Sequence, residues 1–237
     1  MLNEIASAVA AKILNEADIA QIQGTQSLRP LDLRKFAQIA TAFECGQFYN
    51  RHLYNRPYFN SYLDHLAYAA KQAHGMGDGL FLEFGVASGR TINLVARETG
   101  RKIIGFDSFK GLPENWRDGV GQGAFATAIP AVEHNVELCI GMIEDELPKL
   151  LHREKQKIRF IHIDTDLYGV AKYILETCRD RIDDAVIVFD EFFNYPGYQD
   201  HEFKAWHEFQ SYNADLFKFS YLGTGGDVAV SARITRQ

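Results

Sequence analysis

Residues 80–91, LFLEFGVASGRT, indicate the fold most directly, because a short apolar run ends here at two glycines and gives way to a helical pattern. The run at 80–86 has the length and nearly continuous apolar character of a buried parallel strand. Gly85 and Gly89 permit a tight turn, and a helix at 90–99 would present free backbone amides at its N-terminus. A strand, a glycine turn and a helix in this order begin an α/β unit.

Four further apolar runs follow, at 102–108, 136–142, 159–166 and 185–191, and helical stretches separate most of them, at 90–99, 144–155 and 168–182. Apolar strands joined by helices form a parallel sheet covered on both faces. A helix is expected at about 200–212. The last two runs, 217–223 and 227–234, are separated by a short glycine turn, which requires antiparallel pairing. We therefore expect an α/β fold with a Rossmann-like, doubly wound, seven-stranded sheet, mostly parallel, that ends in an antiparallel hairpin.

The N-terminal third of the chain differs from the rest. Residues 1–76 are helical in pattern, and the glycine-rich segment at 75–79 then marks a helix end and a loop. We therefore divide the chain into an N-terminal helical appendage at 1–76 and an α/β domain at 77–237. Aromatic residues between 48 and 62 could line a pocket or pack against the sheet, and the sequence leaves both open.

Composition excludes several classes of function. The net charge of −6 and the lack of a basic region argue against a nucleic-acid partner. Three cysteines, Cys45, Cys139 and Cys178, lie far apart without CxxC spacing, so neither a disulfide framework nor a zinc site is indicated. No run approaches the roughly 20 apolar residues of a membrane span, and no secretory signal pattern begins the chain. We therefore expect a cytoplasmic protein without a membrane partner.

The first three strand ends suggest a nucleoside pocket. The phosphate-binding patterns G-x-x-x-x-G-K-[ST] and G-x-G-x-x-G are absent, which favours a ligand without phosphates. Asp107 ends the second run, where a carboxylate can accept hydrogen bonds from ribose hydroxyls; a turn or cap residue is the less favoured alternative. Gly141 and Met142 end the third run and could either flank an adenine ring or pack in the core.

Four carboxylates follow the fourth and fifth runs: Asp164, Asp166, Asp190 and Glu191. The carboxyl ends of parallel strands lie at one edge of the sheet, so these side chains should converge and need a cation or protons to offset their repulsion. Oxygen ligands favour Mg²⁺ over zinc. The alternative is that Asp166 and Asp190 cap helices. His162 is interpreted as a buried core histidine, and the charged residues at 201–208 as a mostly solvated helix face.

Five segments resemble the macrocin O-methyltransferase (TylF-type) family of class I S-adenosylmethionine-dependent methyltransferases. They are LEFGVASGRT (82–91), GFDSFKGLPE (105–114), EDELP (144–148), HIDTDLY (162–168) and FDEFFNYPG (189–197). The resemblance implies S-adenosylmethionine bound across the first three strand ends and a divalent cation, Mg²⁺ or similar, held by carboxylates after the fourth and fifth. Residues 77–237 would then be the methyltransferase catalytic domain. The chain departs from the family pattern at Glu191, where the family tends to have aspartate, and at Ala87-Ser88, where its glycine motif contains an aromatic residue.

The expected site residues fall into three groups. Donor binding is assigned to Glu83, Gly85, Ser88, Gly89, Thr91, Asp107, Ser108, Gly141, Met142 and Asp164, with Glu83 on the amino group and Asp107 on the ribose. The metal ligands are assigned to Asp164, Asp190 and Glu191. The catalytic carboxylates are assigned to Asp164 and Asp166.

These features predict a methyltransferase that modifies a hydroxyl group on a small molecule, such as a sugar or a natural product, with the help of a metal ion. A metal-independent or nitrogen-directed methyltransferase and a non-catalytic donor-binding protein of the same fold stay open as alternatives. The sequence names neither the acceptor nor the oligomeric state, a homo-oligomer included.

Overall fold

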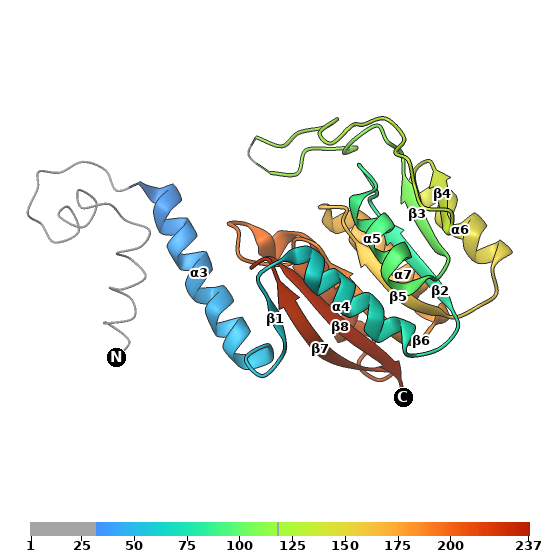
Figure 1. The fold of residues 1–237 in the computed structure, drawn as a ribbon. Coiled ribbons are helices and arrows are strands. Elements are labelled where there is room, and N and C mark those ends of the chain that lie inside the picture. Colours follow the sequence, from blue (N-terminus) through green and yellow to red (C-terminus); the bar gives the residue numbers. More distant parts are fainter. Residues whose placement is uncertain (1–31, 118) are drawn as a thin grey trace, which may run out of the picture. The chain divides into compact units, whose positions relative to one another are not determined.

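The computed structural model describes residues 32–117 and 119–237 (Figure 1). They form two compact units, which we describe separately. The described part of the smaller unit is helix α3 (Leu33–His52) with Asn194–Pro196, and the backbone amide of Asn194 donates to Cys45 Sγ at 3.2 Å. Residues 1–31 of the expected helical appendage lie outside the described residues. The larger unit comprises Leu53–Phe193 and Gly197–Gln237.

One eight-stranded sheet organises the larger unit, in the order β1-β7-β8-β6-β5-β2-β3-β4. The strands are β1 (Tyr58–Phe59), β2 (Leu80–Phe84), β3 (Ile103–Asp107), β4 (Val136–Ile140), β5 (Ile158–Ile163), β6 (Ile182–Phe189), β7 (Phe217–Gly225) and β8 (Ala229–Arg236). All pairs are parallel except those of β8 with β6 and β7. The expected seven strands and the C-terminal hairpin are thus confirmed. The eighth strand, β1, escaped prediction because two residues have no detectable periodicity.

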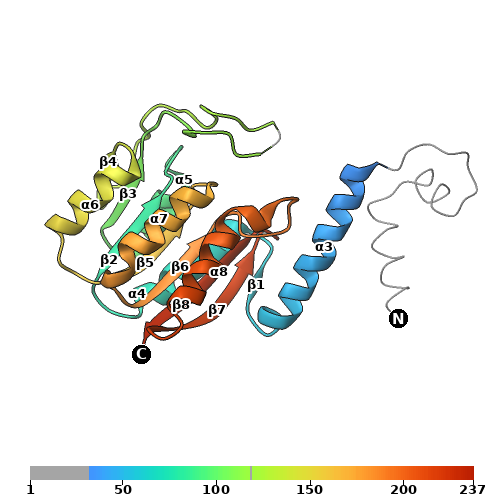
Figure 2. The same cartoon turned by 180° about the vertical axis from the view of Figure 1, so that it is seen from behind.

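Helices cover both faces of this sheet (Figures 1 and 2). On one face α4 (Tyr62–His74) packs beside α5 (Arg90–Thr99), and on the other α7 (Tyr168–Cys178) lies between α6 (Ile143–Arg153) and α8 (Glu202–Tyr212). Short 3₁₀ turns occupy Arg179–Arg181 and Tyr198–Asp200. No helix in the described part of the chain is long and apolar enough to cross a membrane.

Helix α4 packs on the sheet of the larger unit, although the division at residue 76 placed it in the N-terminal appendage. Its small residues Ala69 and Ala73 are fully buried in one apolar cluster with Phe81 and Phe160 of the sheet. The division followed the change from helical to strand-like sequence. Such a change does not distinguish a helix that covers a sheet from one that belongs to a separate unit.

The chain order along the sheet reverses between β2 and β5, since β3 and β4 follow on one side and β6 on the other. Ligands of open parallel sheets bind beyond the carboxyl ends of the strands at such a switch point. The loops that follow β2 to β6 are therefore the expected location of a ligand site.

Candidate functional site

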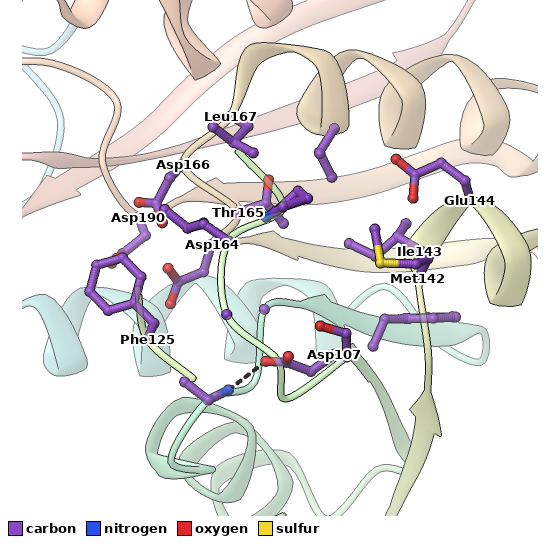
Figure 3. Close-up of a pocket in the computed structure, with 18 of the residues that line it drawn as sticks. Asp107, Phe125, Met142, Ile143, Glu144, Asp164, Thr165, Asp166, Leu167 and Asp190 are labelled. Carbon is purple, nitrogen blue, oxygen red and sulfur yellow. Dashed lines mark hydrogen bonds between the residues drawn. The ribbon is translucent and has the colours of Figure 1, made fainter. Parts of the chain in front are cut away.

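A cavity of about 310 Å³ lies beyond the carboxyl ends of β2 to β6. It brings together nine of the residues assigned from sequence: Gly85, Asp107, Ser108, Gly141, Met142, Asp164, Asp166, Asp190 and Glu191. In Figure 3, Asp164, Asp166 and Asp190 gather beside Phe125, while Met142 and Ile143 lie at the other side. The cavity thus joins an acidic part to an apolar part.

The turn after β2 requires glycine at Gly85. This residue has φ +89°, in the left-handed region that favours glycine. A Cβ atom built there would lie 1.8 Å from the backbone carbonyl oxygen of Asp164. The close approach of the two strand ends places Asp164 directly beside the turn.

Replacing Gly85 by alanine should lower the free energy of unfolding by at least about 2 kcal/mol, because a left-handed conformation alone costs an L-residue about 1–2 kcal/mol and the clash adds to it. Urea unfolding measures the change. Gly169→Ala is the matched control, since Gly169 lies inside α7, where an added Cβ atom would have no described neighbour within 4 Å, and alanine should stabilise that helix slightly. A Gly85→Ala protein as stable as the wild type would contradict this account of the turn.

The carboxylate of Asp107 holds two turns at once. Its Oδ2 accepts the backbone N–H groups of Val86 and Ala87, each at 2.8 Å, and its Oδ1 accepts that of Phe109 at 2.7 Å. One of these bonds is the dashed line at Asp107 in Figure 3. The sequence left open whether Asp107 is a turn residue or a ligand contact. It is a turn residue, and it also lines the cavity, where a carboxylate keeps unused lone pairs for ligand hydroxyls.

Four residues assigned to donor binding do not line the cavity: Glu83, Ser88, Gly89 and Thr91. Glu83 is fully buried, accepts the hydroxyl of Thr91 at 2.8 Å and pairs with His162 Nδ1 at 2.9 Å. The geometry therefore does not support the expected contact of Glu83 with the amino group of a donor. The reason is that the side chain of Glu83 points into the core. The sequence does not reveal this direction, because both faces of a sheet covered by helices on both sides are buried.

His162 is a buried core histidine, as expected, and both its ring nitrogens are engaged. Besides Glu83, it contacts the hydroxyl of Tyr62 at 2.6 Å through Nε2. Burial raises the pKa of Tyr62 well above its usual range, and the charges of Asp190 and Asp164 raise it further, so the hydroxyl stays protonated beside the site. A buried chain of hydrogen bonds thus runs from Glu83 to the acidic part of the cavity. The sequence placed Tyr62 only within an aromatic-rich stretch.

The acidic side chains show the repulsion that their convergence predicts. Burial, followed by the charge of Asp190, raises the pKa of Asp164 well above its usual range. Burial, followed by the charges of Glu191 and Asp190, raises the pKa of Asp166 to about 7. Burial also raises the pKa of Glu191, against the opposing effect of Arg117, whose guanidinium lies 3.6 Å from it. Such a cluster retains protons unless a cation replaces them.

Glu202 is an acidic residue that the sequence analysis missed. The interpretation of 201–208 as a solvated face is wrong for this side chain, which is only 1% exposed at the start of α8. Its Oε1 accepts the backbone N–H of Thr165 at 3.4 Å. Burial raises its pKa well above the usual range, and Asp166 and Asp190 add to this effect. Charged residues at a helix start usually face solvent, so the sequence carried no signal for its burial.

The chemistry of the cluster suits a hard divalent cation. One potential ligand atom from each of His162, Asp164 and Asp190 lies within 4.8 Å of the others. Because both nitrogens of His162 already have partners, the carboxylates are the better candidates. Carboxylate oxygens are the ligands that Mg²⁺ prefers.

The segment between β3 and β4 supplies another wall of the cavity. Leu112, Pro113 and Phe125 contribute apolar surface to it. Near the acidic part, the guanidinium of Arg117 stacks over the ring of Trp116 at 3.9 Å. This segment therefore brings both apolar surface and one positive charge to the site.

Comparisons with known proteins agree with this geometry. Residues 82–192 match the methyltransferase domain family. Among solved structures, the calicheamicin methyltransferase CalS11 is 22% identical, over 72% of this chain and 77% of its own, with a TM-score of 0.58. The apo structure of CalS11, described as a TDP-rhamnose 3'-O-methyltransferase, is 21% identical, over 70% and 76% of the chains, with a TM-score of 0.51.

A cofactor-bound protein from MTB, Rv0187, is 16% identical, over 89% of this chain and 99% of its own, with a TM-score of 0.51. At these identities the likeness shows a shared fold. The comparison with curated proteins finds no match. Residues 82–192 are thus similar to a methyltransferase domain, and the solved structures share the fold of this chain.

Proposed function

We propose that this protein transfers the methyl group of S-adenosylmethionine to a hydroxyl group of a small molecule, with the help of a divalent cation; the match of residues 82–192 to the methyltransferase domain family supports the reaction class. One observation carries the proposal: a nucleoside-sized cavity at the switch point of the sheet ends in a cluster of four carboxylates, Asp164, Asp166, Asp190 and Glu191. Such a cluster suits the removal of a proton from a hydroxyl group better than the binding of an anion.

The apolar part of the cavity is the proposed place for the donor. Met142 keeps 42% of its surface exposed, and with Ile143 it offers the adenine ring an apolar surface to pack against. Gly85 and Gly141 allow close approach to the backbone, and Asp107 and Ser108 present oxygen atoms to the ribose. Glu83 is left out of this donor contact, since it points into the core.

The acidic part is the proposed place for the acceptor. Methyl transfer requires an oxygen nucleophile in line with the methyl carbon and the loss of its proton. We assign the removal of that proton to Asp164 or Asp166. Asp164, Asp190 and Glu191 would hold the cation. When bound, a divalent cation lowers the pKa of the acceptor hydroxyl and fixes its position.

Sugar hydroxyls are the first acceptor class to test, because CalS11, described as an enzyme that methylates TDP-rhamnose, shares the fold. Phenolic hydroxyls of small natural products are the second. The net charge of −6 makes a nucleic acid an unfavourable partner, and we place the reaction in the cytoplasm.

The deciding experiment combines an acceptor screen with exhaustive chelation. Turnover with S-adenosylmethionine should fall at least about 100-fold after chelation, since a metal Lewis acid contributes several kcal/mol, and added Mg²⁺ should restore it. Calorimetric binding of S-adenosylhomocysteine should survive chelation. Activity that persists without metal removes the cation from the proposal. Methylation of amines alone favours the nitrogen-directed alternative, and donor binding without any turnover favours a non-catalytic protein.

A further inference from the structure

We propose that Glu202 supports the cation site from beside it, as a buried acidic side chain that positions the segment carrying Asp164 and Asp166. The inference rests on the proposed function, because it concerns the cation of that site. Glu202 begins α8, which follows β6 in the chain, whereas Asp164 and Asp166 follow β5. The three acidic residues therefore come together only in the folded protein.

The first support is a pair of buried polar atoms. Among the described residues, Glu202 Oε2 has no hydrogen-bond partner, and neither does the Oγ1 atom of Thr165. The same two residues are already joined by the bond from the Thr165 amide to Glu202 Oε1. Burying an unpaired polar atom costs about 1–3 kcal/mol, and more for a charged group. Two such atoms, on residues that contact each other, favour the binding of a further polar group or ion beside Glu202.

The second support is the charge around Glu202. None of the ion pairs among the described residues includes it, and the charged side chains that act most strongly on its carboxyl group are acidic: Asp166, Asp190 and Glu191. Glu208 of the same helix is different, since it pairs with Lys172 at 3.1 Å and accepts the hydroxyl of Tyr168 at 2.7 Å. A buried carboxyl group surrounded by acidic groups stays charged only if a cation lies near it, whereas Glu208 already has Lys172 as a partner.

The third support is the backbone of the segment that Glu202 touches. Asp166 has φ +64°, a conformation that residues other than glycine seldom adopt and that persists only when the surroundings hold it. Glu202 contacts the amide of Thr165, the residue between Asp164 and Asp166. This contact restrains the segment in the conformation that directs Asp164 and Asp166 to the cavity.

The test is Mn²⁺ binding to the full-length protein, followed by electron paramagnetic resonance, in the wild type, Glu202→Gln and Glu208→Gln. Glutamine keeps the shape and an acceptor for the Thr165 amide but removes the charge. Glu202→Gln should weaken Mn²⁺ affinity by about 10–100-fold, the usual effect of changing a residue that supports a metal site. Glu208→Gln should stay within about twofold of the wild type. S-adenosylhomocysteine affinity should be unchanged in both variants, which shows that they are folded.

Unchanged Mn²⁺ affinity in Glu202→Gln, with normal binding by the wild type, overturns this inference and leaves the proposed function standing. A wild-type protein that binds no Mn²⁺ overturns both this inference and the cation of the proposed function. Should Glu202→Gln fail to fold, Glu202→Asp takes its place. Aspartate keeps the charge on a side chain that is shorter by one methylene group, so the affinity for Mn²⁺ should fall at least about threefold. An unchanged affinity again overturns the inference.

Discussion

Replacing Asp190 by asparagine should lower kcat about 10³-fold and leave the affinity for S-adenosylhomocysteine within about threefold of the wild type. Asp190 follows β6 in the acidic part of the cavity, where its charge acts on Asp164 and on the hydroxyl of Tyr62. Asparagine has nearly the same shape but no charge, so it should weaken cation binding while the apolar donor part stays intact. A loss of several kcal/mol of transition-state stabilisation corresponds to this factor.

Asp183→Asn is the matched control, because Asp183 lies exposed at the other end of the same strand. Single-turnover kinetics and calorimetry with S-adenosylhomocysteine measure the two quantities separately, and the control should behave as the wild type in both. Full turnover by Asp190→Asn would remove this residue from the reaction. An equal loss of donor affinity and turnover would instead place Asp190 in the donor pocket.

Replacing Asp107 by alanine should have two large effects. The affinity for S-adenosylhomocysteine should fall at least about 100-fold, and the free energy of unfolding should fall by about 2–4 kcal/mol. The variant loses three hydrogen bonds from backbone N–H groups to one carboxylate, at Val86, Ala87 and Phe109. A hydrogen bond to a charged group contributes about 1.5–3 kcal/mol, and the three are not independent because they share one side chain.

Two further variants separate the turn from the ligand contact. Asp107→Asn keeps one acceptor oxygen and should lie between the wild type and Asp107→Ala in both measurements. Asp183→Ala removes an exposed carboxylate from β6 and should change neither. Isothermal calorimetry and urea unfolding give the two readouts. If Asp107→Ala is destabilised but binds S-adenosylhomocysteine normally, Asp107 is a turn residue alone and its assignment to the ribose is wrong.

The amino-acid sequence was sufficient to predict the sheet and the edge at which the cavity lies. The apolar runs located seven of the eight strands, and the predicted helix at 90–99 matches α5 at both ends. Asp164, Asp166 and Asp190 could be assigned to one cavity because they follow parallel strands, whose carboxyl ends meet at the same edge whatever the details of packing. Gly85 was similarly predictable, since a turn of this kind admits few other residues.

Which other polar side chains lie beside the acidic residues of that cavity depends on tertiary packing. Glu83 lies in the strand before the glycine turn yet points into the core, whereas Glu202, expected on a mostly solvated helix face, is buried beside the acidic residues. Tyr62 comes within reach of Asp190 through the packing of α4 on the sheet. The periodicity of a sequence gives the face of an element on which a side chain lies. Which residue that side chain contacts depends on how elements far apart in the chain pack together, because contacts across a sheet join residues with no fixed spacing in sequence.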